Sequence, residues 1–468
     1  MKRTYERPVI KKLQTSTLNK FGISSIGRQK VRTDIDGITI EDLVKTYGSP
    51  LFVYSEKTIH RKFRQFQRAF ATRYPDVVFG WSYKTNYLKA ICAVMHEQGA
   101  YAEIVSKMEY EKARALGIPG ERIVFNGPHK PFDTLLEAVA DGVTINIDHL
   151  DEVEDLERVA ERLGKIVSVG LRLNLDAGIT PQWSRFGLNL ESGQALAAVR
   201  RIAHGGRLRL TGLHCHLGTY ILDPDAYRRQ VAKMLEFAYV VEDRFGYRLQ
   251  TLDIGGGFPS QSKLRGTYLS PDVAVPAVEE YAEAICDALH SNLRPQHYPR
   301  LILEAGRALI DDAGYLVTSV VAAKRLPDGT RAYVIDAGVN LLYTSFWYKH
   351  NIETDRDAQG LNEPSVLYGP LCMNIDCLDE AVPLPPLDRG QRLILSPVGA
   401  YNNTQWMQFI EYRPNVVLVG REGQVELIRE AEDLSDLDRR ERLPERLAPS
   451  QWNNGGRTAL AGASADVI

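Results

Sequence analysis

Two charged positions stand at the ends of short apolar runs, where they could take part in chemistry. Lys84 follows such a run in WSYKTN, and Glu304 with Arg307 ends another in LEAGR. A desolvated lysine loses its proton more easily and can form a Schiff base with a carbonyl. A carboxylate can hold a protonated ring nitrogen, and a guanidinium can pair with a phosphate. Taken alone, Lys84 is better explained as a solvated lysine at a strand end, and an internal salt bridge explains Glu304 and Arg307 equally well.

Three consecutive glycines, Gly255, Gly256 and Gly257, follow another apolar run in LDIGGGFP. Without Cβ atoms, their backbone N–H groups can line a concave anion site. A tight turn needs fewer glycines than this, so the segment predicts a phosphate site, with a plain turn as the alternative.

Two histidines, His214 and His216, are two residues apart in HCHLGTY and would share one face of a strand. That spacing permits a shared metal and therefore a metal-dependent hydrolase, but no further histidine follows a predicted strand. Packing of His216 against a flat cofactor ring is the better interpretation, and His214 could be a core histidine.

Two residues of the C-terminal third could also react. Cys372, in GPLCMNID, lies in a segment too polar for a core, so its thiol could donate a proton. Tyr401, in GAY, could cap a phosphate. A small buried cysteine and a packed tyrosine are the alternatives.

The elements that must position these residues form a repeating pattern. Each short apolar run is followed by a turn and a longer amphipathic stretch, and one unit takes about 28 residues, as in a (β/α)8 barrel. A helix is also predicted at 56–73, with Ser55 as its N-cap. The eight runs are Val77–Ser82, Tyr101–Val105, Ile123–Phe125, Thr144–Ile147, Val167–Leu173, Leu210–His216, Leu252–Ile254 and Arg300–Glu304.

Beyond about residue 308 the pattern changes to β-rich runs broken by proline and glycine. The predicted fold class is therefore α/β, a TIM barrel with a C-terminal all-β domain, and LFVY at 51–54 could bridge the two. The predicted division is an N-terminal arm at 1–34, a segment at 35–50 that could join the β domain, the barrel at 51–308, the β domain at 309–430 and a tail at 431–468.

The composition excludes several classes of protein. The 468 residues carry 57 Lys+Arg and 59 Asp+Glu, a net charge of −2, which gives no support to nucleic-acid binding. Five cysteines without a CxxC pair do not suggest disulfides or a zinc knuckle. No apolar stretch approaches the length of a membrane span. We expect a cytoplasmic protein.

Taken together, six strings in this order resemble the fold-type III pyridoxal-phosphate decarboxylases, which act on diaminopimelate, ornithine or arginine and share the alanine racemase-like fold. The strings are YKTN, HCHLGT, DIGGGF, EAGR, GPLC-x3-D and GAY, and the resemblance covers roughly residues 35–425. It implies an amino-acid decarboxylase with pyridoxal phosphate as cofactor.

The resemblance also implies residue roles. Lys84 would form the Schiff base with the cofactor, His216 would stack on its ring and Glu304 would hold the ring nitrogen. The phosphate would be surrounded by Gly255, Gly256, Gly257, Thr219, Arg307 and Tyr401. Substrate would contact Arg307, Tyr348, Met373, Asp376 and Tyr401.

In this family the GPLC cysteine and the nearby aspartate serve a site shared by two subunits. The resemblance therefore implies a homodimer in which Cys372 and Asp376 act in the partner's site, with Cys372 returning a proton to Cα.

The chain departs from diaminopimelate decarboxylases where they hold the far end of the substrate. Met373 stands where they have an acidic residue, and Thr344 where they have an arginine, although Tyr348 is kept. Charged hydrogen bonds are each worth about 1.5–3 kcal/mol, so losing both should change the substrate. The sequence predicts decarboxylation of another amino acid or amino-acid conjugate, as in natural-product or siderophore assembly, with a carrier protein as a further partner.

Three alternatives remain within the resemblance. A genuine diaminopimelate decarboxylase and a fold-type III racemase share the fold, and the racemase would need an acid–base tyrosine where this chain has the Cys372 segment. An inactive regulator would be expected to lack Lys84 or Cys372, and both are present.

Overall fold

Eight short strands pair in parallel and close into a barrel in the computed structural model, which describes residues 30–267 and 269–447. The barrel closes because β13 pairs with β4 and β10 pairs with β8. All eight predicted runs are strands, and the predicted fold class is confirmed. The strands are β4 (Val77–Ser82), β5 (Tyr101–Ile104), β6 (Ile123–Phe125), β7 (Thr144–Ile147), β8 (Val167–Asn174), β10 (Leu208–His214), β11 (Thr251–Asp253) and β13 (Arg300–Leu303).

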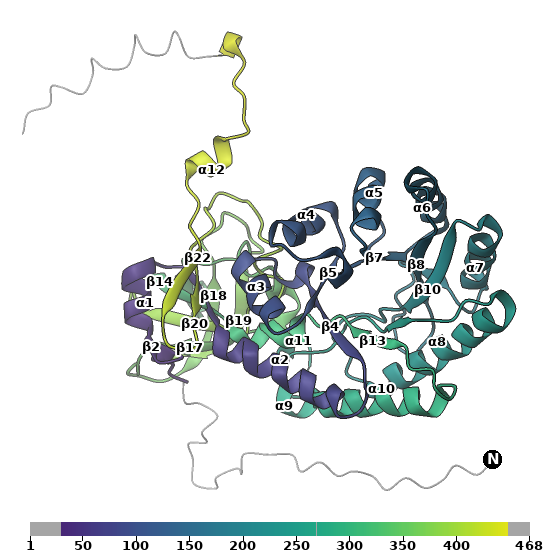
Figure 1. The fold of residues 1–468 in the computed structure, drawn as a ribbon. Coiled ribbons are helices and arrows are strands. Elements are labelled where there is room, and N and C mark those ends of the chain that lie inside the picture. Colours follow the sequence, from purple (N-terminus) through teal and green to yellow (C-terminus); the bar gives the residue numbers. More distant parts are fainter. Residues whose placement is uncertain (1–29, 268, 448–468) are drawn as a thin grey trace, which may run out of the picture.

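Helices surround the barrel (Figure 1), and one of them precedes the first barrel strand. Helix α2 (Glu56–Ala71) packs between α10 and α3 and so fills the place of an eighth barrel helix. Its stripe of Ile59, Phe63, Phe66 and Phe70 is buried, and Ser55 Oγ accepts the Thr58 N–H at 3.0 Å, as the sequence predicts. The other helices of the ring are α3 (Lys89–Glu97), α4 (Lys107–Ala115), α5 (Phe132–Ala140), α6 (Leu150–Leu163), α7 (Gln194–Gly205), α8 (Pro224–Phe245) and α10 (Val278–Asn292).

A second, mainly antiparallel sheet lies beside the barrel and includes both early and late segments of the chain (Figure 1). The central path of the sheet runs β19, β18, β15, β14, β3, β21, β22, and β20 pairs with both β14 and β17. Its strands are β3 (Leu51–Ser55), β14 (Gly314–Arg325), β15 (Arg331–Ile335), β17 (Asn351–Thr354), β18 (Glu363–Tyr368), β19 (Cys377–Leu384), β20 (Arg392–Ser396), β21 (Val416–Val419) and β22 (Val425–Arg429).

The boundary predicted at residue 51 differs from the structure. Strand β3 falls in the range 51–308 predicted for the barrel, but it pairs with β14 and with β21 in the second sheet, in keeping with the expectation that LFVY could bridge the two domains. Its five residues are all buried, so an apolar run alone could not reveal which sheet it joins. The chain thus starts in the sheet, crosses to the barrel through α2 and returns after β13.

The segments at the two ends lie only partly within the described residues. In the segment 35–50, helix α1 (Ile40–Tyr47) packs Ile40 and Leu43 against the sheet. Most of the predicted arm at 1–34 and the tail beyond residue 447 lie outside the described part of the chain. Within the described residues, no helix is long and apolar enough to cross a bilayer.

Candidate active site

A cavity of about 700 Å³ opens at the C-terminal ends of the barrel strands. Barrel enzymes place their active sites at this end, because loops from several strands meet there. The barrel contributes Lys84, His216 and Glu304, and the segments of the second sheet contribute Tyr348 and Tyr401. The structure thus brings together residues that are more than 300 positions apart in the sequence.

Lys84 is placed by a short 3-10 turn, Tyr83–Thr85, directly after β4. Its Nζ donates a hydrogen bond to Glu103, a buried residue of the neighbouring strand β5. Burial alone would lower the pKa of Lys84, but the carboxylates of Glu103 and Glu304 outweigh it and raise that pKa. Without a bound cofactor the amine is therefore held as an ammonium.

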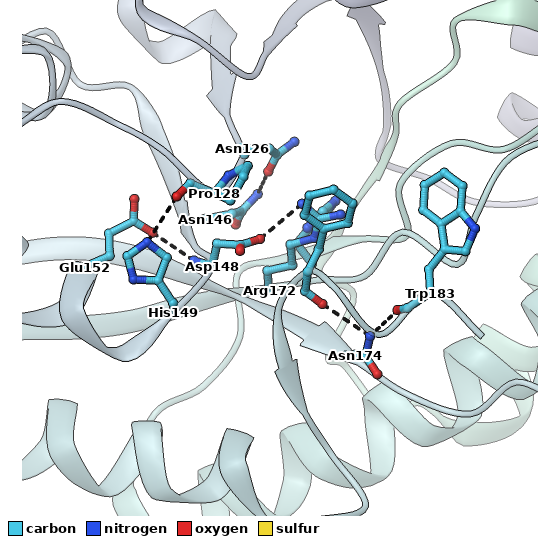
Figure 2. Close-up of polar contacts among 12 residues, drawn as sticks. Asn126, Pro128, Asn146, Asp148, His149, Glu152, Arg172, Asn174 and Trp183 are labelled. Carbon is cyan, nitrogen blue, oxygen red and sulfur yellow. Dashed lines mark hydrogen bonds and ion pairs between the residues drawn. The ribbon is translucent and has the colours of Figure 1, made fainter. Parts of the chain in front are cut away.

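A chain of hydrogen bonds joins this amine, through Glu103, to a second acid of the site, Glu304. Asn126, which follows β6, donates through Nδ2 to Glu103 Oε1 at 3.0 Å and also to Glu304 Oε1. Asn146 on β7 orients that amide by donating to its Oδ1 at 2.9 Å, as Figure 2 shows. Burial would raise the pKa of Glu304, but His214, Lys84 and His216 lower it, so Glu304 is a carboxylate.

His216 is held as a neutral ring. Its Nδ1 accepts the backbone N–H of Gly256 at 3.0 Å, which places the ring proton on Nε2. Burial lowers the pKa of His216 to about 3. The ring of Trp183 meets it edge to face at a centroid distance of 5.7 Å.

The glycine segment packs too tightly for side chains. Gly255 and Gly257 have φ of +68° and +99°, which favours glycine, and a Cβ at Gly256 would lie 2.2 Å from the Glu304 carbonyl oxygen. The Gly256 N–H already serves His216, so the three amides are not equally free for an anion. Gly257 and Thr219 line the cavity.

Arg307 lies at the start of the short helix α11 (Arg307–Ile310) and faces the same cavity. Its guanidinium lies 4.5 Å from the Tyr348 ring centroid and 4.8 Å from that of Tyr401. Asp311 is 3.7 Å away, and the buried Nε has no hydrogen-bond partner among the described residues. The group therefore has capacity left for an anionic ligand.

Arg172 and Asn174 stand at the end of a predicted strand, on the rim where barrel enzymes build their sites, but the sequence assigns them no role; of the two, Arg172 lines the cavity. Figure 2 shows Arg172, near the end of β8, facing Asp148, with Nη1 at 3.2 Å from Oδ1. Asn174, the last residue of β8, donates to the carbonyls of Trp183 and Phe186 and so ties down the loop that carries the two aromatic rings.

Three predicted site residues do not reach this cavity. Cys372, Met373 and Asp376 lie between β18 and β19, and Cys372 is exposed. Asp376 is buried, and its two oxygens each accept a backbone N–H at 2.8 Å, from Val339 and from Leu371. Its carboxylate therefore shapes the loop that carries Cys372, and the expectation that Asp376 contacts substrate does not fit this geometry.

The donor set fits pyridoxal phosphate. The cavity offers an amine at Lys84, an ionised carboxylate at Glu304, a neutral imidazole at His216 and a guanidinium with an unused buried Nε at Arg307. An aldehyde, a protonated ring nitrogen, a flat ring and a phosphate are the groups that these side chains can bind.

Comparisons with known proteins agree with this site. The family model described as "Pyridoxal-dependent decarboxylase, pyridoxal binding domain" matches residues 56–311. A diaminopimelate decarboxylase of Aquifex aeolicus is 30% identical over 85% of this chain and 93% of its own length. One of Methanocaldococcus jannaschii is 27% identical over 88% of this chain and 95% of its own length.

Solved structures give the same result. A crystal structure of the M. jannaschii diaminopimelate decarboxylase has a TM-score of 0.81 at 27% identity and covers 90% of this chain and 98% of its own. A structure of that protein with L-lysine has a TM-score of 0.80 at 26% identity, covering 88% and 96%. The chain belongs to the fold-type III pyridoxal-dependent decarboxylases, the carboxy-lyases that use pyridoxal phosphate to release carbon dioxide from amino acids.

Proposed function

We propose that this decarboxylase removes the α-carboxylate of an amino acid or amino-acid conjugate whose far end differs from that of diaminopimelate. The observation that carries the proposal is the pairing of the cavity's cations. Lys84 is paired with Glu103 and Arg172 with Asp148, and the unpartnered Nε of Arg307 is expected to serve the phosphate of the cofactor. Within the described residues of one chain, no further cation of this cavity is left for a distal carboxylate.

The remaining lining supports a less charged far end. Trp183, Phe186, Leu264 and Trp347 line the cavity, and Thr344 has its hydroxyl bound to Asn402 Oδ1 at 2.9 Å. A buried charged group needs a partner, whereas an apolar or amide-containing group can pack against such walls. A conjugated amino acid presents this kind of surface.

The roles of the site residues follow from their charge states. Pyridoxal phosphate, when bound, draws electrons away from the bond between Cα and the carboxylate. Lys84 supplies the amine that joins the cofactor, and Glu304, as a carboxylate, accepts the N–H of a protonated ring nitrogen. His216 offers an uncharged ring face, and the ring of Trp183 packs beside it edge to face.

The proton that replaces the carboxylate needs a donor, and we assign this role to Cys372 of a second copy. The thiol is exposed on a loop that Asp376 fixes through two backbone hydrogen bonds. It does not line the cavity of its own chain. A homodimer with shared sites would bring the Cys372 thiol to Cα of the substrate in the partner's site. The same assembly would bring the nearby Met373 to that site.

The test is a substrate panel with carbon dioxide detection on wild type, Lys84→Ala and Cys372→Ala. We expect wild type to prefer a conjugated or uncharged amino acid, Lys84→Ala to lose the absorbance of the bound cofactor, and Cys372→Ala to protonate Cα slowly or on the wrong face. Normal turnover in both variants would reject the mechanism.

A genuine diaminopimelate decarboxylase is the second candidate, because the relatives named above carry that name. Rapid formation of lysine from meso-diaminopimelate, faster than any other reaction of the panel, would establish it. An epimer formed without carbon dioxide would instead indicate a racemase.

A further inference from the structure

Two buried polar side chains, His214 and Asp253, lie next to Glu304 and have no role so far. His214 is the last residue of β10, Asp253 is the last residue of β11, and the two are register partners. Glu304 directly follows β13, the next strand around the barrel. Polar atoms of the three residues all lie within 4.8 Å of one another.

Two side-chain nitrogens approach one oxygen of the Glu304 carboxylate. Oε1 accepts from Asn126, and Nε2 of His214 lies 3.3 Å from the same atom. Within the described part of the chain, no hydrogen bond is donated to Oε2, and Glu304 lines the cavity. The arrangement leaves one oxygen for a ligand.

The two neighbours have unused hydrogen-bonding capacity. Asp253 Oδ1 accepts the Gly255 N–H at 2.9 Å, but its buried Oδ2 has no partner among the described residues. Both ring nitrogens of His214 are likewise buried without a hydrogen-bond partner there, although Nε2 lies 3.3 Å from Glu304 Oε1. Buried polar atoms are rarely left unpaired, so a cluster of them beside a single carboxylate needs an explanation.

We propose that His214 and Asp253 are positioning residues that keep the Glu304 carboxylate in place and ionised, with His214 on its Oε1 side, so that Oε2 can accept the ring N–H of the cofactor. His214 acts as an N–H donor and Asp253 as a neutral acid. The inference rests on the role proposed for Glu304 in holding the cofactor.

The electrostatics of the cluster agree with this division. Burial, and then the neighbouring Glu304, raise the pKa of Asp253 well above its usual range, so the two acids carry a single negative charge. That charge stays on Glu304, because His214, Lys84 and His216 lower the pKa of its carboxyl group. The titratable and charged groups that act on the two acids are His214, His216, Lys84 and Glu103.

The experiment compares His214→Leu, which removes the donor, with His214→Gln, which keeps an N–H near the same place. His297→Leu is the matched control, because His297 is also a buried histidine and bonds only the Leu249 carbonyl outside the site. Two quantities are measured, the Kd for pyridoxal phosphate and, in cofactor-free protein with 13C-labelled glutamate, the infrared bands of carboxyl and carboxylate groups.

We expect His214→Leu to raise the Kd about 10-fold to 100-fold, the range seen for partners behind metal-ligating side chains, and to add a protonated carboxyl band. His214→Gln should restore the Kd to within about threefold of wild type, a difference under 1 kcal/mol. Asp253→Asn replaces the neutral acid with a neutral donor, so its Kd should also stay within about threefold of wild type. His297→Leu should change neither the Kd nor the infrared bands.

Three results would overturn the inference. The first is a wild-type Kd and unchanged bands in His214→Leu. The second is a large loss of affinity in Asp253→Asn, which would mean that Asp253 acts as a charged group. The third is a divalent metal that copurifies with wild type and is lost in the His214 variants, which would make the cluster a metal site.

The outcomes also separate this inference from the proposed function. If wild type binds no pyridoxal phosphate or releases no carbon dioxide from any amino acid, the proposed function fails, while the infrared bands of the cofactor-free protein still test the cluster. If His214→Leu does not fold, His214→Gln and Asp253→Asn decide, because a large loss of affinity in either one contradicts the roles assigned.

Discussion

Lys84 and His216 face the same cavity, yet the protein holds them in opposite charge states. Both are partly buried at the cavity wall, and desolvation lowers the pKa of either group. Lys84 has two carboxylates beside it, which reverse that effect, whereas His216 has an N–H donor on Nδ1. The charge of each residue is therefore decided by its immediate neighbours, and each can be tested by one substitution.

Glu103→Gln should lower the pKa of Lys84, because it removes the carboxylate that contributes most to raising it. A fall of about one unit would make the neutral amine about tenfold more abundant at a given pH. The measurement is the pH dependence of amine labelling at Lys84 in cofactor-free protein. Glu111→Gln, on the exposed face of α4, is the control and should leave the labelling rate unchanged.

His216→Asn should remove part of the acid sensitivity of folding. The pKa of His216 is about 3 in the folded protein, and an imidazole in an unfolded chain titrates at about 6.5. Between these values the unfolded state binds more protons, so the free energy of unfolding falls as the pH drops through this window. Between about pH 7 and about pH 5, His216 alone should lower the free energy of unfolding of wild type by an amount on the order of 2 kcal/mol.

Urea unfolding of wild type and His216→Asn at both pH values measures this contribution. The free energy of unfolding of the variant should depend less on pH, whereas the exposed His129→Asn should behave like wild type. Equal pH dependence in wild type and His216→Asn would show that the folded state does not exclude the proton from His216.

At the scale of elements, a loop of the barrel rim is held in place by hydrogen bonds from a buried polar side chain to neighbouring elements. Lys130 is fully buried in the β6–α5 connection, and its Nζ donates to the carbonyls of Gly127 and Asn146 and to Glu152 of α6. All three ammonium protons are used. This one side chain ties the loop that begins with Asn126 to the start of helix α6.

Lys130→Met should therefore destabilise the protein by about 3–5 kcal/mol, because it leaves the buried Glu152 without its cation. Chemical denaturation measures the loss. Lys165→Met is the control, since Lys165 is exposed and bonds a single carbonyl. A loss below about 1 kcal/mol for Lys130→Met would mean that the pair contributes no more than a surface ion pair.

At the scale of the molecule, the site combines parts that no single domain contains. The barrel supplies Lys84 and Glu304, the second sheet supplies Tyr348 and Tyr401, and Cys372 is exposed outside the cavity. A dimer that is related by two-fold symmetry would repeat any shared contact twice. The complete site would then exist only in the assembly.

Mixing Lys84→Ala with Cys372→Ala subunits tests this assembly. If Cys372 serves the partner's site, random mixing gives half heterodimers with one intact site each, and activity should return to about a quarter of wild type. Each variant alone should be nearly inactive. No recovery after exchange of subunits, verified by tagged heterodimers, would place the thiol in its own chain's site.

The sequence by itself determined the barrel strands, the helix at α2 and the residues that line the cavity from strand ends. These features depend on local pattern, because strand length, apolar periodicity and a capping serine are readable without distant contacts. The ordered strings around Lys84, His216 and Glu304 likewise lie within short segments, so their resemblance to a family needed no fold.

The tertiary structure alone decided which residues act together. Strand β3 lies within the range predicted for the barrel, with LFVY expected to bridge the two domains; it pairs in the second sheet, since the pairing partner of a buried strand is set by residues far away in the chain. Asp376 looked like a substrate ligand but binds two backbone amides, and His214 and Asp253 gained significance only when adjacent strands placed them beside Glu304. The charge states and hydrogen-bond partners of these residues depend on distances between neighbouring strands. Those distances are set only when the chain folds.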